Sequence, residues 1–95
     1  MEAKKAYIYW TRRKPKPFIT GLEYFPHIVR ADDINKERWS VRFFITEENK
    51  ENEGHIELKM LVDNDACLAF FETLKPGTKF YLFEGPYKVA QGYFL

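Results

Sequence analysis

The most informative segment of this chain is 55–62, where every second residue is apolar. The apolar residues Ile56, Leu58, Met60 and Val62 alternate with His55, Glu57 and Lys59. Successive side chains of a β-strand point to opposite faces, so this segment predicts a strand with one buried face.

Most of the other segments show the same two-residue period. They are rich in β-branched and aromatic residues and are separated by Gly, Pro, Asp and Asn, which favour turns. The sequence predicts further strands over 3–12, 24–31, 38–46, 78–84 and 87–95. Pro26 places the start of its strand at an edge or a bulge, and Gly85 and Pro86 predict a tight connection between the last two strands.

Two segments depart from this pattern. Residues 47–54 are polar, carry several glutamates and end in Gly54, so we expect a mobile acidic loop there. Over 64–74, apolar residues fall at i, i+3, i+4 and i+7 after a capping residue, which predicts one short helix. These apolar residues are Cys67, Phe70, Phe71 and Leu74, with Asn64 or Asp63 as the cap.

Six short strands and one helix predict a mainly β fold, an antiparallel barrel with a single helix. The chain has 95 residues, which predicts a single domain over 1–95. A content of 45% hydrophobic and 18% aromatic residues is too high for intrinsic disorder. Aromatic residues at this frequency are expected mostly to fill the barrel.

The C-terminal stretch carries a recognisable order of residues. It runs from Gly77 through Phe80, then Glu84 and Gly85, to Val89 and Gly92. This order resembles the signature of the C-terminal β-barrel domain of elongation factor Tu. Phe83 stands where that family has an arginine.

The N-terminal half resembles the same family in the same order. Pro17 and Phe18 are followed by Gly21, by Tyr24-Phe25-Pro26-His27-Ile28 and by Asp33; Phe25 replaces a second family arginine. The resemblance implies an elongation factor Tu-like barrel and contact with RNA or a translation component. It also implies that Glu84 and Gly85 match a glutamate-glycine pair near the tRNA backbone. No phosphate-binding loop of a GTPase is present.

Net charge is +1, but the distribution is uneven. Residues 1–16 contain six basic residues and one acidic residue, a local charge of +5 against −4 for the remainder. A basic run beside Tyr7, Tyr9 and Trp10 is a pattern typical of phosphate contact and base stacking. The candidate RNA- or partner-binding residues are therefore Arg12, Arg13, Lys14 and Lys16, together with His27, Glu84 and Gly85 from the resemblance.

The sequence predicts no catalysis, no metal site and no cofactor. His27, His55 and Cys67 do not have the spacing of metal ligands, and Cys67 has no evident base to activate it. Asp32 and Asp33 are adjacent on a turn and are expected to form that turn. We expect no small-molecule substrate, and the sequence does not indicate an oligomeric state.

A single cysteine cannot form an internal disulfide, which favours a reducing compartment. Because the sequence also shows neither a signal peptide nor a membrane-spanning run, we expect a cytoplasmic protein without membrane contact. Two functions stay open: an RNA- or translation-related binding module, and a protein-interaction barrel such as an immunity, adaptor or regulatory protein. The missing family arginines and the near-zero net charge favour the second.

Overall fold

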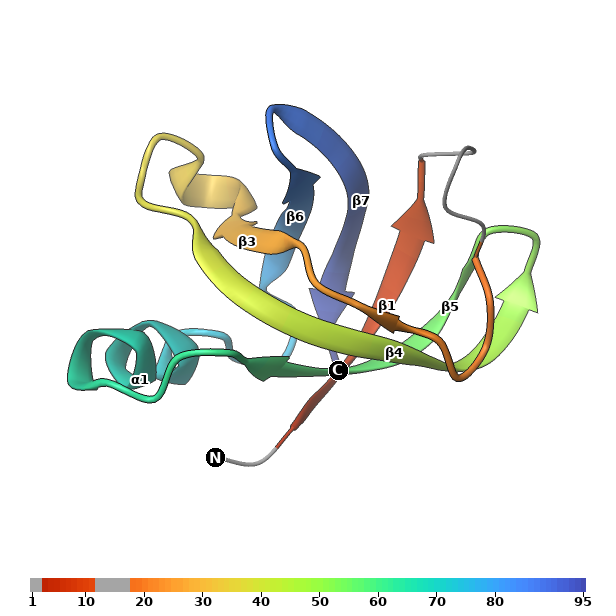
Figure 1. The fold of residues 1–95 in the computed structure, drawn as a ribbon, viewed down its shortest axis with the longest axis horizontal. Helices are drawn as coiled ribbons and strands as arrows, with labels where there is room; N and C mark the ends of the chain where they lie inside the picture. The colour runs from red at the N-terminus through yellow and green to blue at the C-terminus, as the bar shows by residue number, and fades with distance from the viewer. Residues whose placement is uncertain (1–2, 12–17) are drawn as a thin grey trace.

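The computed structural model describes residues 3–11 and 18–95 of the chain (Figure 1). The elements are, in order, β1 (Lys4–Trp10), β2 (Glu23–Tyr24), β3 (His27–Arg30), the 3-10 helix η1 (Ala31–Asp33), β4 (Trp39–Lys50), β5 (Glu53–Met60), α1 (Asp65–Glu72), β6 (Lys79–Glu84) and β7 (Tyr87–Phe94). The strands predicted near both ends of the chain and the helix are confirmed.

Six strands close into an antiparallel barrel. Around the barrel the order is β4-β3-β6-β7-β1-β5, and β5 returns to pair with β4. The short strand β2 pairs with β4, where Tyr24 lies opposite Phe43. The predicted mainly β barrel with one short helix is thus confirmed, with one additional strand.

The predicted acidic loop over 47–54 is wrong, because this segment is part of a long hairpin. Strand β4 continues to Lys50, which pairs with Glu53 across a turn at Glu51 and Asn52. Asn52 adopts a φ of 62°, a left-handed conformation that asparagine tolerates well. The end of the hairpin is largely exposed, so its strands lack the apolar face that would have marked them in the sequence.

The strand predicted over 24–31 is divided into β2 and β3. Both pair with β4, and they are separated at Phe25 and Pro26. Proline has no amide hydrogen for the ladder, so the pairing is interrupted there. The chain then enters η1 instead of continuing as a strand to Ala31.

Aromatic side chains form a cluster in the hydrophobic core of the barrel. Trp10 packs on Tyr24 with ring centroids 5.2 Å apart, and Tyr24 stacks on Phe43 at 5.0 Å. Phe18 completes this group beside Trp10. Such pairs contribute about 0.5–1.5 kcal/mol beyond the area they bury.

The helix α1 connects β5 to β6 at one end of the barrel (Figure 1). The amide of Cys67 donates to Oδ1 of Asn64 at 2.8 Å, so Asn64 is the N-cap. Cys67, Phe71 and Leu74 join the hydrophobic core. The partly buried ring of Phe70 stacks instead on Trp39 of β4.

Gly92 allows β7 to approach β1 closely. A Cβ atom at this position would lie 2.3 Å from the carbonyl oxygen of Tyr7 and 2.8 Å from Cγ2 of Ile8. These distances are shorter than real contacts, so a side chain would force the two strands apart. The approach brings the outer faces of β7 and β1 together as one surface.

Candidate nucleic-acid interface

Four tyrosines gather on the outside of the barrel. Each alternates with core residues on its strand, so that Ile8 and Ala6 point inward while Tyr7 and Tyr9 point outward. The surface that we name the tyrosine face consists of Tyr7 and Tyr9 of β1, Lys79 and Tyr81 of β6, and Gln91 and Tyr93 of β7.

Strand register arranges these side chains in two rows across the strands. In the first row Lys79 lies opposite Tyr93, and Tyr93 lies opposite Tyr7. In the second row Tyr81 and Tyr9 both lie opposite Gln91. Directly opposite side chains on neighbouring strands are close enough to contact one another.

The rings of the first row pack against each other. Tyr7 stacks on Tyr93 with centroids 5.9 Å apart and an interplanar angle of 24°. The rings of Tyr9 and of His55 in β5 also contact the Tyr7 ring. Both contacts are edge-on, with centroid distances of 5.4 Å for Tyr9 and 5.1 Å for His55. These contacts hold the tyrosines in place on the surface, while Tyr9 stays 38% exposed.

A groove of about 450 Å³ runs over the tyrosine face. Three tyrosines line this groove: Tyr9, Tyr81 and Tyr93. Lys79 and Gln91 add an ammonium group and an amide to its walls. Beside the groove, Nζ of Lys88 lies 4.7 Å from the centre of the Tyr81 ring and 3.4 Å from Oε1 of Gln91. Flat aromatic rings and ammonium groups therefore lie side by side.

Glu53 marks the β5 border of the tyrosine face. The hydroxyl of Tyr7 donates to Oε1 of Glu53 at 2.9 Å. Partial burial, together with this hydrogen bond to a carboxylate, raises the pKa of Tyr7 to about 12. Nδ1 of His55 is hydrogen-bonded to Oδ1 of Asn49 at 2.7 Å, which fixes the imidazole beside Tyr7.

The predicted basic residues Arg12, Arg13, Lys14 and Lys16 lie outside the described residues. The described chain before them ends at Thr11, whose amide donates to the carbonyl of Val89 in β7 at 2.8 Å. The basic run therefore follows directly, in sequence, from the strand that carries Tyr7 and Tyr9.

The other predicted residues, His27, Glu84 and Gly85, lie near one another. His27 pairs with Phe83, the neighbour of Glu84, and Gly85 forms the turn between β6 and β7 with a φ of 58°. The guanidinium of Arg38 joins them: it lies 3.7 Å from the Phe83 ring and donates to the carbonyl of Gly85 at 3.0 Å. Sequence reasoning missed Arg38, because it lies on a loop far from this turn in the chain.

The structure separates the three residues considered as metal ligands. His27 lies exposed on β3, His55 lies on β5, and Cys67 is buried on α1. Among residues 3–11 and 18–95, no three His, Cys, Asp or Glu side chains form a group able to hold a metal ion. Burial raises the pKa of the Cys67 thiol, which disfavours the reactive thiolate.

Sequence reasoning found two of the four tyrosines of the tyrosine face, because Tyr7 and Tyr9 lie beside the basic run. These two rings contact each other, and no second layer lies over them in the part of the chain that the structure describes. The signal for Tyr81 and Tyr93 was present, because each alternates with buried residues on its own strand.

Comparisons with known proteins give no relative for this chain: no family model, no curated protein and no solved structure matches it. The resemblance to the elongation factor Tu barrel therefore stays a prediction. Within the described residues, no helix has the length and apolar character needed to span a bilayer.

Proposed function

We propose that this domain is a binding module for single-stranded RNA, without catalytic activity, and that the tyrosine face is its RNA site. The observation that carries the proposal is the groove lined by Tyr9, Tyr81 and Tyr93 with Lys79 beside them. Proteins that bind single strands combine such aromatic platforms with basic groups that follow the backbone.

Stacking supplies the main part of the expected affinity. Each base that stacks on an aromatic side chain contributes about 1–3 kcal/mol, whatever its identity. The ring contacts of Tyr7 hold Tyr9 and Tyr93 in position before RNA arrives. Binding therefore requires little additional ordering of side chains.

The charges on these strands fit a polyanion. Lys79 lines the groove, Lys88 lies over Tyr81, and Lys5 lies exposed two residues before Tyr7. A nearby carboxylate, that of Glu53, lies on the neighbouring strand β5 and accepts a hydrogen bond from the Tyr7 hydroxyl. Gln91 adds an amide able to hydrogen-bond to base edges or sugar hydroxyls.

The resemblance to the elongation factor Tu barrel makes tRNA the first RNA to test, beside an unstructured oligonucleotide. A cytoplasmic location, inferred from the single cysteine, agrees with such a ligand. Arg38, beside Glu84 and Gly85, supplies a guanidinium at the turn that the resemblance relates to tRNA contact.

Fluorescence anisotropy with labelled oligo(U), tRNA and a blunt RNA duplex tests the proposal at two salt concentrations. We expect oligo(U) to bind more tightly than the duplex, and affinity to fall as salt rises. Tyr9→Ser and Tyr81→Ser should each weaken binding by about tenfold or more, because each removes a stacking surface.

Tyr87→Ser is the matched control. Tyr87 is the more exposed tyrosine, at 68%, but it does not line the groove. Its loss should leave the affinity for oligo(U) unchanged. Equal effects of the Tyr9, Tyr81 and Tyr87 substitutions, or no salt-sensitive RNA binding at all, contradict the proposal.

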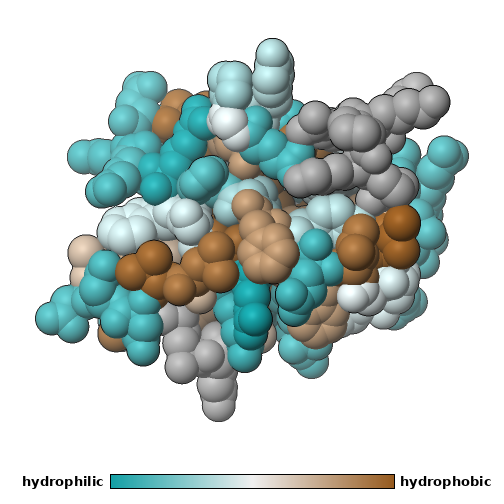
Figure 2. All heavy atoms as spheres, viewed as in Figure 1, coloured by the Kyte–Doolittle hydropathy of each residue, from teal (hydrophilic) through white to brown (hydrophobic). Residues whose placement is uncertain are grey.

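A protein-interaction role is the second candidate, and a separate surface favours it. Strand β4 runs along the front of the molecule in the view of Figure 1. In the same view, hydrophobic residues gather across the middle of the surface (Figure 2). Exposed apolar residues of β4 and the segments around β2 include Ile19, Leu22, Phe25 and Phe44. Apolar groups collected on one surface are typical of protein contact sites.

Affinity capture with quantitative mass spectrometry separates the two candidates. A protein partner captured in stoichiometric amount, lost with Phe44→Ser and kept with Tyr9→Ser, supports the interaction role. RNA retained by the unaltered protein and lost with Tyr9→Ser supports the RNA role instead.

A further inference from the structure

A second cavity of about 300 Å³ lies between α1 and the segment that joins β3 to β4. Its apolar lining comes from Val29, Trp39 and Phe70. None of the six residues of the tyrosine face lines it, so this cleft is a separate site.

The apolar wall of the cleft is aromatic. Trp39 and Phe70 stack with ring centroids 5.7 Å apart and an interplanar angle of 22°. Both rings are only partly buried although they pack against the core, which leaves part of their surface to the cleft. Such a wall is suited to a flat or bulky apolar group.

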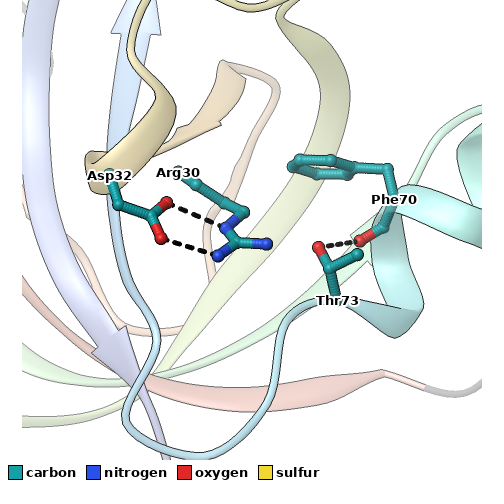
Figure 3. A network of polar contacts seen from close by, with 4 residues as sticks. All are labelled: Arg30, Asp32, Phe70 and Thr73. Atoms are coloured by element: carbon teal, nitrogen blue, oxygen red, sulfur yellow. Dashed lines mark hydrogen bonds and ion pairs between the residues drawn. The ribbon is translucent and has the colours of Figure 1, made fainter.

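Arg30 places a guanidinium at this wall. Its Nε donates to Oδ1 of Asp32 at 3.0 Å and its Nη2 donates to Oδ2 at 2.7 Å (Figure 3). A guanidinium has five N–H donors, and this bidentate contact uses two of them on one edge. Asp32 thus holds the group in a fixed orientation, with its other terminal nitrogen on the side of Phe70 and Thr73 (Figure 3).

The remaining donors of Arg30 suit a carboxylate. One N–H on each terminal nitrogen points away from the carbon, and this pair matches the two oxygens of a planar carboxylate. The cleft also contains Lys36, a second cationic residue.

Acidic side chains complete the lining. Asp33 and Glu37 both border the cleft. Together with Asp32, which contacts Arg30, three acidic residues face two basic ones, Arg30 and Lys36. This balance disfavours a ligand with net negative charge and favours one that carries both signs.

We propose that this cleft binds a zwitterionic α-amino acid with an aromatic or large apolar side chain. Its carboxylate binds the open edge of Arg30, its ammonium group lies near Asp33 and Glu37, and its side chain packs on Trp39 and Phe70. The geometry that supports this is the cleft itself and the orientation of Arg30 by Asp32.

Titration of the full chain with L-phenylalanine, followed by tryptophan fluorescence and by NMR shifts of the Trp39 indole, tests the proposal. We expect saturable binding with a dissociation constant of about 1 mM or lower. Phenethylamine lacks the carboxylate and 3-phenylpropionate lacks the ammonium group, so each should bind at least about tenfold more weakly.

Substitution of Arg30 tests the assigned carboxylate contact. Arg30→Gln should weaken phenylalanine binding by about tenfold and remove the preference over phenethylamine. Arg42→Gln is the matched control, because Arg42 is exposed on β4 and does not line the cleft. It should leave binding unchanged.

The analogue series on the unaltered protein keeps the proposal testable even if Arg30→Gln does not fold. Absence of saturable phenylalanine binding overturns it. Binding of 3-phenylpropionate or phenethylamine as tight as phenylalanine also overturns it. Neither result bears on RNA binding by the tyrosine face.

Discussion

Tyr7 illustrates how much one surface side chain can organise. Its ring contacts Tyr9, Tyr93 and His55, and its hydroxyl is bonded to Glu53. The same side chain therefore links β5 to β7 across β1, on the outside of the barrel. The sequence showed that Tyr7 lies beside the basic run, but it did not show which residues of distant strands contact Tyr7.

The pKa of Tyr7 provides a test of this arrangement. In the folded protein it is about 12, above the ordinary 10.0, so the folded state holds the phenolic proton more tightly than the unfolded state does. The resulting stabilisation is complete below pH 10 and is lost as pH rises towards 12. Tyr7→Phe should remove the tyrosinate absorbance step near pH 12 and reduce the loss of stability in this window.

Glu53→Gln serves as the partner experiment for the Tyr7 titration. It removes the carboxylate but leaves the ring contacts, so the pKa of Tyr7 should fall from about 12 towards its ordinary value. An absorbance titration with an unchanged step near pH 12 in both variants would show that another group titrates there.

Among the elements, those with an apolar face were predictable and those without one were not. Strand β5 was predicted from its alternation, and α1 from its four apolar positions and its cap. The strand ends at Met60, however, and Val62, which was expected on its buried face, is 45% exposed. The end of the β4–β5 hairpin was predicted as a loop, because exposed paired strands and exposed loops have similar composition. Only the backbone pairing, with Lys50 opposite Glu53, distinguishes them.

The cap of α1 makes a prediction at this scale. Asn64→Ala removes the acceptor of the Cys67 amide and should lower the free energy of unfolding by about 1 kcal/mol. Urea denaturation followed by circular dichroism measures the change. Asn64→Asp keeps an acceptor oxygen and should retain most of the stability; if it costs as much as Asn64→Ala, the cap is not the cause.

For the whole molecule, composition predicted a filled barrel, and the distribution of aromatic residues corrects that prediction. Of the six tyrosines, all of them described, only Tyr24 is buried. The phenylalanines supply more of the interior, including the pair Phe80 and Phe94 at 4.7 Å. Sequence indicates how many large side chains exist, but the barrel register decides which of them face outward.

The cleft beside α1 could not be predicted from the sequence either. Residues from β3, β4, the intervening segment and the helix form it together.

The closeness of β7 and β1 makes a prediction about barrel closure. Gly92→Ala should destabilise the fold by about 1–3 kcal/mol, because its Cβ would overlap the Tyr7 carbonyl. Gly85→Ala is the comparison: Gly85 has a φ of 58°, but among the described residues no atom beyond its two chain neighbours lies within 4 Å of its added Cβ. It should cost about 1 kcal/mol from backbone conformation alone. Thermal unfolding that ranks the two variants in the opposite order would contradict this reading of the β7–β1 contact.

The pairing of β1 with β7 also has a consequence for how the chain reaches its native state. Ala6 lies opposite Phe94, so two partners separated by almost the entire sequence must meet. Such distant pairings carry a high entropic cost of loop closure and slow the search for the native topology. During synthesis, β1 leaves the ribosome before β7 has been made. Until then, the edge of β1 that pairs with β7 in the barrel has no partner strand.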